Sequence, residues 1–158
     1  MRTQAEAVLP DASKPPAKPA KTKKQARTLT NHRSFAMSYV DGFVLPVPAA
    51  KLDAYKKLAR KAGKIWMEYG ALQYVECVAD DVKSGKVTSF PQSVQLKKNE
   101  VVVFSWIVYR NRRDRDRINK KVMADPRLAD MVDPKNLPFD GMRMFWGGFK
   151  PVVQYGAE

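Results

Sequence analysis

One segment, VVVFSWIVY at 101–109, constrains the fold of this chain more than any other. Its branched and aromatic side chains favour a β-strand, and successive side chains of a strand point to opposite faces of the sheet. Val103 and Ile107 therefore lie on one face, while Phe104 and Trp106 lie on the other. Because both faces are apolar and one layer of helices covers only one of them, the opposite face needs a second cover.

Apolar periodicity predicts two helices and three further strands around this segment. Steps of three and four between apolar residues indicate a helix from Leu52 to Tyr69 that ends at Gly70 and lacks a polar cap at its start. Asn111 is suited to cap a second helix, which the Asp125-Pro126 pair ends. Apolar alternation predicts the three further strands at 38–47, 72–79 and 143–153.

The resulting order, β-α-β-β-α-β, is typical of an α+β, ferredoxin-like sandwich with both helices on one face. The last strand is two-sided as well, because Phe145 and Phe149 oppose Met144 and Trp146. An uncovered apolar face of this size exceeds what soluble monomers usually expose. We therefore predict a homodimer in which two sheets stack as a dimeric α/β barrel. The alternative is that the loop at 82–100 and the C-terminal residues cover this face within one chain.

Charge and composition divide the chain near Met37. The chain has 158 residues and a formal net charge of +13, and residues 1–36 carry eight basic side chains against two acidic ones. These 36 residues contain four prolines, no glycine and one aromatic residue, so we expect a disordered basic tail that cannot bury a core. Residues 37–158 form the predicted folded domain and keep a net charge of +7. Another interpretation is that Met37 is the native start.

Several classes of function are excluded by what the chain lacks. Cys77 and His32 are the only residues of their types, which excludes a disulfide framework and a structural zinc site. A serine or cysteine hydrolase is nearly excluded, because its only imidazole would lie in the tail. We expect no metal and no cofactor. The sequence contains neither a run of 18 apolar residues nor a secretory signal, so we expect a cytoplasmic protein without a membrane partner.

Six collinear blocks carry a resemblance to a known family. The chain resembles the YbaA-like bacterial proteins, a family of unknown function in the dimeric α/β-barrel superfamily, over essentially all of 38–152. The resemblance implies the fold and the homodimer, in agreement with the two-sided strands, and it implies no catalytic residues. The blocks are YVDGFVLPVP at 39–48, YVECVADDV at 74–82, GKVTSFPQSVQLK at 85–97, VVFSWIVY at 102–109, DRINKKVMADPRLADM at 116–131 and PFDGMRMFWGGF at 138–149.

Three charged residues are candidates for binding a ligand. Glu76 shares a strand face with Tyr74, so inside a barrel it is a partly buried carboxylate suited to act as a general base or ligand anchor; the alternative is a salt bridge to Arg143. Asp41 lies mid-strand, where a charge is costly unless it is paired or faces a cavity. Arg143 opens the last strand and is suited to clamp an anionic ligand, or to pair with a local carboxylate.

Two tryptophans are the remaining candidates. Trp106 and Trp146, with Phe149, are suited to line a flat aromatic pocket for a planar ligand, or to serve as core or interface anchors.

Two functions follow from these residues. The first is binding or transformation of a small organic molecule in the barrel cavity, and the sequence leaves open whether the protein is an enzyme. The alternative is a basic accessory factor that associates with RNA or DNA through the tail and the helix Arg110–Lys121. Asp114 and Asp116 weaken this alternative, because they are spaced to pair with the arginines of that helix.

Overall fold

The computed structural model describes residues 38–156, so the predicted tail at 1–36 lies outside the described residues. The strands are β1 (Tyr39–Pro48), β2 (Gln73–Val78), β3 (Glu100–Tyr109) and β4 (Phe145–Phe149). The helices are α1 (Leu52–Glu68), α2 (Phe90–Ser93), α3 (Arg112–Met123) and α4 (Ala129–Val132). Short 3-10 turns lie at Ala49–Lys51 (η2), Pro126–Leu128 (η3), Pro134–Asn136 (η4) and Gly141–Arg143 (η5).

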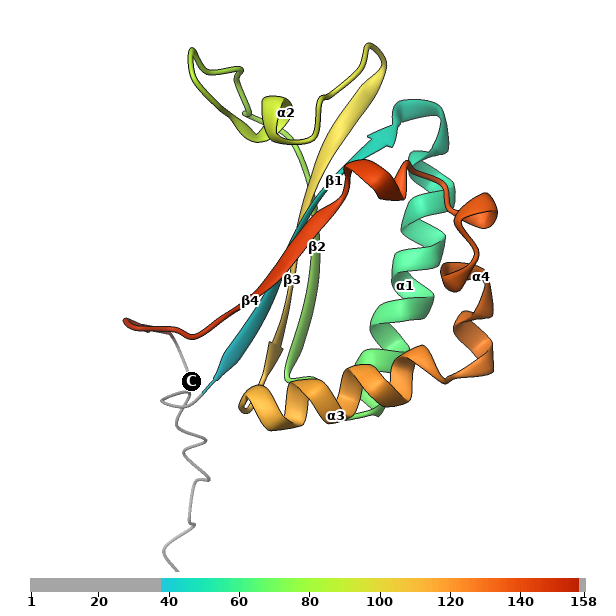
Figure 1. Ribbon diagram of the computed structural model, residues 1–158, viewed down its shortest axis with the longest axis vertical. Helices are drawn as coiled ribbons and strands as arrows, with labels where there is room; N and C mark the ends of the chain where they lie inside the picture. Colours follow the sequence, from blue (N-terminus) through green and yellow to red (C-terminus); the bar gives the residue numbers. More distant parts are fainter. Residues whose placement is uncertain (1–37, 157–158) are drawn as a thin grey trace, which may run out of the picture. The chain divides into compact units, whose positions relative to one another are not determined.

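The four strands form one antiparallel sheet in the order β2-β3-β1-β4. Figure 1 shows α1, α3 and α4 on one side of this sheet, and the short α2 on the other side near one end of the strands. The α+β class and the alternation of elements are therefore confirmed.

The two faces of β3 differ as the sequence predicts. Val103, Ile107 and Tyr109 point toward the helices and are buried in the core there. Phe104 lies on the face away from the helices and remains 41% exposed. The apolar residues of α1 and α3, among them Ile65 and Ile118, fill the core on the helix side.

Both long helices begin and end as their sequences indicate. The start of α1 has no side-chain cap, and the helix ends before Gly70, which adopts a φ of 109° that disfavours other residues. The side chain of Asn111 caps α3 by accepting a hydrogen bond from the backbone N–H of Asp114.

The face away from the helices is covered at one end only. Val94, in the segment between β2 and β3, is buried there against Val44 and Val102, so the alternative of a cover within one chain is realised in part. Phe104, Phe145 and Phe149 remain exposed, the last at 63%. We call the residues of this face beyond the covered end the open face; its larger members are Val75, Phe104, Trp106, Val108, Phe145 and Phe149.

Two elements differ from prediction. The last strand spans 145–149 rather than 143–153: it pairs with β1 from Val40 to Val44, and Asp140 caps a 3-10 turn just before it. The loop at 82–100 contains α2, whose start is capped by the side chain of Ser89. A single helical turn is too short to produce a periodic pattern in the sequence.

Candidate functional site

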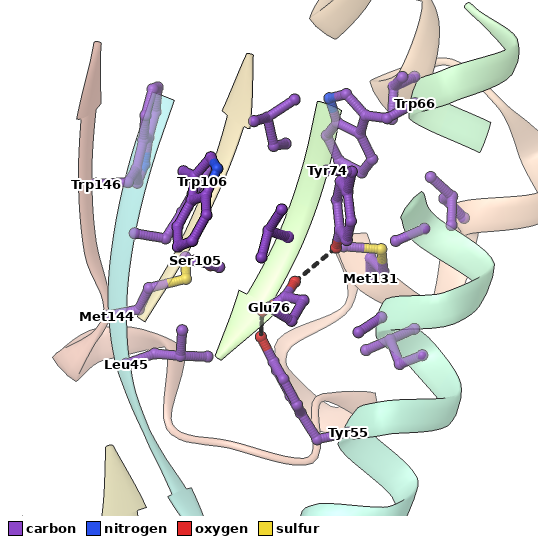
Figure 2. Close-up of a pocket in the computed structure, with 18 of the residues that line it drawn as sticks. Leu45, Tyr55, Trp66, Tyr74, Glu76, Ser105, Trp106, Met131, Met144 and Trp146 are labelled. Carbon is purple, nitrogen blue, oxygen red and sulfur yellow. Dashed lines mark hydrogen bonds between the residues drawn. The ribbon is translucent and has the colours of Figure 1, made fainter. Parts of the chain in front are cut away.

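A cavity of about 440 Å³ lies between the sheet and the helices that cover it. Its walls come from β1, β2, β3 and β4, from α1 and α3, and from the segment between α3 and β4. Figure 2 shows the side chains that converge on it. Most are apolar, and six of the seven aromatic ones form three pairs: Phe43 with Trp146, Tyr55 with Phe139, and Trp66 with Tyr74.

The carboxylate of Glu76 projects into this apolar cavity. The hydroxyl of Tyr55 donates a hydrogen bond to Glu76 Oε2 at 2.7 Å, and that of Tyr74 donates to Oε1 at 2.6 Å (Figure 2). Such short distances are typical of hydroxyls that donate to an ionised carboxylate. Alternation along β2 places Tyr74 and Glu76 on the same face, and α1 brings Tyr55 from across the cavity.

Both tyrosines are held as hydrogen-bond donors. Burial, and then the negative charge of Glu76, raise the pKa of the Tyr55 and Tyr74 hydroxyls well above their ordinary value. Each hydroxyl therefore keeps its proton and directs it at the carboxylate. Among the described residues that line the cavity, Glu76 alone carries a charge.

Gly63 makes room for one of these donors. A Cβ at this position in the middle of α1 would lie 2.6 Å from Cδ1 and 2.9 Å from Cε1 of Tyr74. A glycine inside a helix costs roughly 1 kcal/mol relative to alanine. That cost is offset by the close approach of the Tyr74 ring, which brings the hydroxyl to Glu76.

Asp41 lies behind the cavity wall. Its side chain is fully buried, accepts a hydrogen bond from Asn119 Nδ2 at 3.2 Å, and has Arg115 Nε at 3.2 Å as an ion-pair partner. Burial raises the pKa of Asp41, and the hydrogen bond from Asn119 and the charge of Arg115 oppose the rise. Asn119 does line the cavity, and its Oδ1 accepts from Trp66 Nε1 at 2.9 Å. Asp41 therefore holds a cavity residue in place without facing the cavity.

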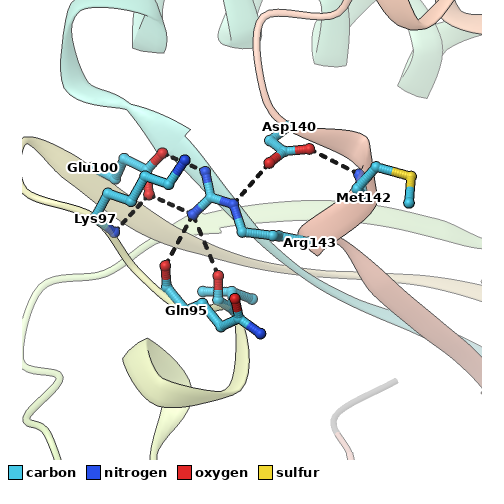
Figure 3. A network of polar contacts seen from close by, with 7 residues as sticks. Gln95, Lys97, Glu100, Asp140, Met142 and Arg143 are labelled. Carbon is cyan, nitrogen blue, oxygen red and sulfur yellow. Dashed lines mark hydrogen bonds and ion pairs between the residues drawn. The ribbon is translucent and has the colours of Figure 1, made fainter.

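Arg143 lies outside the cavity and is fully engaged with other parts of the chain. Its guanidinium makes two bonds to Glu100, at 2.6 and 2.7 Å, and one to Asp140 at 2.8 Å (Figure 3). It also donates to the backbone carbonyl of Gln95 at 3.1 Å. The hydrogen bonds from Arg143 lower the pKa of Glu100 to about 2. Arg143 thus ties the segment before β3 to the start of β4, and its carboxylate partners are not Glu76.

The two tryptophans occupy opposite faces of the sheet. Trp146 lies opposite Phe43 in the strand pairing, and their stacked rings, 6.0 Å apart, border the cavity. Trp106 is also among the residues that line the cavity, but its ring packs against Phe104 and its Nε1 donates to Gln73, both on the open face. Within one chain, both tryptophans border the cavity, but their rings lie on opposite faces of the sheet.

The arginines of α3 are partly paired. Asp114 contacts Arg110 and Arg117, as the spacing predicts. Asp116 instead contacts its neighbour Arg115, which also contacts Asp41 on β1. The other basic side chains of the helix, at 112, 113, 120 and 121, are exposed.

Sequence reasoning missed Tyr55, Gly63 and Asn119 as parts of the site. Tyr55 fits the apolar stripe of its helix, so nothing in the pattern separates it from an ordinary core residue. Gly63 carried a signal, because a glycine within an otherwise continuous helical pattern suggests a packing reason.

The family model described as "Protein of unknown function (DUF1428)" matches residues 38–141. The chain belongs to this family. The proteins named "Uncharacterized protein YbaA" from Escherichia coli K12 and from Shigella flexneri are each 50% identical to it over 117 residues, covering 74% of this chain and 98% of the relative. The predicted YbaA-like family is therefore confirmed. The match to a solved structure titled "De novo designed protein Foldit4" covers 74% of this chain and 99% of the designed chain, at 8% identity and a TM-score of 0.37. A TM-score this low does not establish a shared fold.

Residues 38–156 of the DUF1428 chain lack two features. No helix in this range is long and apolar enough to cross a membrane. The same residues contain no group of three or more His, Cys, Asp or Glu side chains placed to hold a metal ion.

Proposed function

We propose that this DUF1428 protein is a cytoplasmic homodimer that binds a small organic molecule in the cavity of each subunit. The observation that carries the proposal is the placement of Glu76, a carboxylate with two tyrosine donors, inside an otherwise apolar cavity. Burying a charged group in such surroundings costs free energy unless the charge is paired. Convergent polar groups in an apolar pocket are typical of ligand sites.

The size and walls of the cavity support a ligand rather than a packing defect. Cavities that bind small molecules usually measure about 300–1,000 Å³, and this one measures about 440 Å³. Its aromatic pairs offer flat surfaces to a planar molecule, while Met123, Met131 and Met144 are flexible enough to adapt to its outline.

A fluorescent dye tests whether the cavity takes a ligand. Uncharged N-phenylnaphthylamine should brighten on binding the wild-type protein, and Ala59→Phe, which places a ring in the cavity, should abolish the signal. Ala54→Phe is the matched control, because Ala54 is exposed on the same helix. Equal dye binding by wild type and both variants would place the dye elsewhere and remove the support for this site.

The homodimer is the second part of the proposal. An apolar open face that includes Phe104, Phe145 and Phe149 exceeds what a monomer usually leaves in water. The order β-α-β-β-α-β with strand order β2-β3-β1-β4 suits a ferredoxin-like subunit that pairs sheet to sheet as an α/β barrel. We expect sedimentation equilibrium to give a dimer for wild type and a monomer for the double variant Phe104→Glu, Phe149→Lys.

A control separates the loss of this interface from a general effect of surface charge. Met142 is 93% exposed in η5, so Met142→Glu adds a charge without touching the open face and should leave the dimer intact. A wild-type chain that sediments as a monomer at micromolar concentration would contradict the barrel.

Association with nucleic acid stays a prediction. It depends on the tail at 1–36 and on the exposed basic side chains of α3, and it requires an affinity that falls steeply as salt rises. Absence of binding to RNA and DNA at low salt would contradict this prediction.

A further inference from the structure

We propose that the ligand of the cavity is an organic cation, a protonated amine carried on a flat apolar body. This inference rests on the proposed function and specifies its ligand. It begins with the charge inside the cavity, where Glu76 is the one charged side chain among the lining residues that the structure describes. No lysine, arginine or histidine in that set balances it.

Glu76 has room for a further donor. An ionised carboxylate offers about four lone-pair directions, and Tyr55 and Tyr74 each use one, on different oxygens. The tyrosines cannot neutralise the charge, because they donate hydrogen bonds and remain uncharged. An ammonium group that enters the cavity meets an opposite charge in surroundings of low polarity, where the attraction is stronger than in water.

The walls suit the same chemistry. Besides Trp106, whose ring packs on the open face, six aromatic residues line the cavity: Phe43, Tyr55, Trp66, Tyr74, Phe139 and Trp146. The faces of aromatic rings attract cations, most strongly where water is excluded. Such rings beside one carboxylate stabilise an amine and its apolar body together.

An anionic ligand is disfavoured in this cavity. A carboxylate or phosphate ligand would be repelled by Glu76 and would find no cation to pair with among the described residues of the cavity wall. Arg143, the residue best suited by sequence to hold an anion, spends its donors on Glu100, Asp140 and two backbone carbonyls outside the cavity.

Three ligands with one skeleton test the proposal by calorimetry on the full chain at neutral pH. We expect naphthylmethylamine to bind at least about tenfold more tightly than naphthylmethanol. Naphthoate should not bind measurably. Glu76→Gln should remove the preference for the amine, and Glu68→Gln, which removes the same charge from a site outside the cavity, should preserve it.

The outcomes separate this inference from the proposed function. Equal affinities for the amine and the alcohol, or tighter binding of naphthoate, would contradict an organic cation as the ligand. Binding of N-phenylnaphthylamine would still show that the cavity takes a ligand. Failure of that dye to bind would instead overturn the proposed function, on which this inference rests. If Glu76→Gln does not fold, the comparison of the three ligands on wild type still decides, because it needs no variant.

Discussion

Alanine at position 63 tests the link between packing and the candidate site. At most helix positions, replacing glycine with alanine stabilises a protein by about 1 kcal/mol. Here the new Cβ would lie 2.6 Å from Cδ1 of Tyr74, where ordinary carbon contacts lie at about 3.5–4.0 Å. The ring must therefore move by about 1 Å, and overpacking of this kind costs about 1–3 kcal/mol.

The net expectation for Gly63→Ala is a loss of about 1 kcal/mol in the free energy of unfolding, since a cost of about 2 kcal/mol exceeds the helical gain of about 1 kcal/mol. Without the ring, in a Tyr74→Ala background, the same substitution should stabilise by about 1 kcal/mol. The coupling between the two positions is then about 2 kcal/mol, within the usual range for residues in contact.

Urea denaturation followed by circular dichroism, at one fixed protein concentration, measures all four proteins of this cycle. Ala54→Gly, at an exposed position of the same helix, supplies the ordinary cost of glycine in α1. If Gly63→Ala stabilises the wild-type protein by as much as Ala54→Gly destabilises it, the Tyr74 ring does not pack on Gly63 and our explanation of this glycine is wrong.

Three further predictions concern the carboxylates. Because the folded-state pKa of Glu100 is lowered to about 2 by Arg143, its stabilising effect is present above the unfolded pKa of about 4.3 and is lost as the pH falls toward 2. The stability deficit of Glu100→Gln in urea should therefore shrink over that interval. The pH dependence has the opposite sign for Asp41, because burial raises the pKa of this carboxyl. The stability of wild type relative to Asp41→Asn should fall as the pH rises above about 4 and level off above the folded pKa. A stability difference that grows with pH would contradict this. Tyr55→Phe removes a donor to the Glu76 carboxylate and should cost about 1.5–3 kcal/mol in thermal or urea unfolding, whereas a neutral effect would mean that the bond is not made.

The sequence by itself determined the longer elements and the two-sided character of the sheet. The periods of two and of three to four that predict β1, α1, β3 and α3 are properties of the local chain, and so are the caps at Asn111 and Gly70. The alternation of side chains along the strand also placed Glu76 and Tyr74 on the same face. These two residues are half of the site.

The tertiary structure alone decided which partner each polar side chain meets. Arg143 was as free by sequence to pair with Glu76 as with any carboxylate, but the strand order places it beside Glu100, 43 residues away in the chain. Tyr55 and Gly63 belong to an ordinary amphipathic helix until that helix packs across β2 and brings a hydroxyl to Glu76 and a gap to Tyr74. Such pairings depend on contacts between distant segments, which no local period encodes.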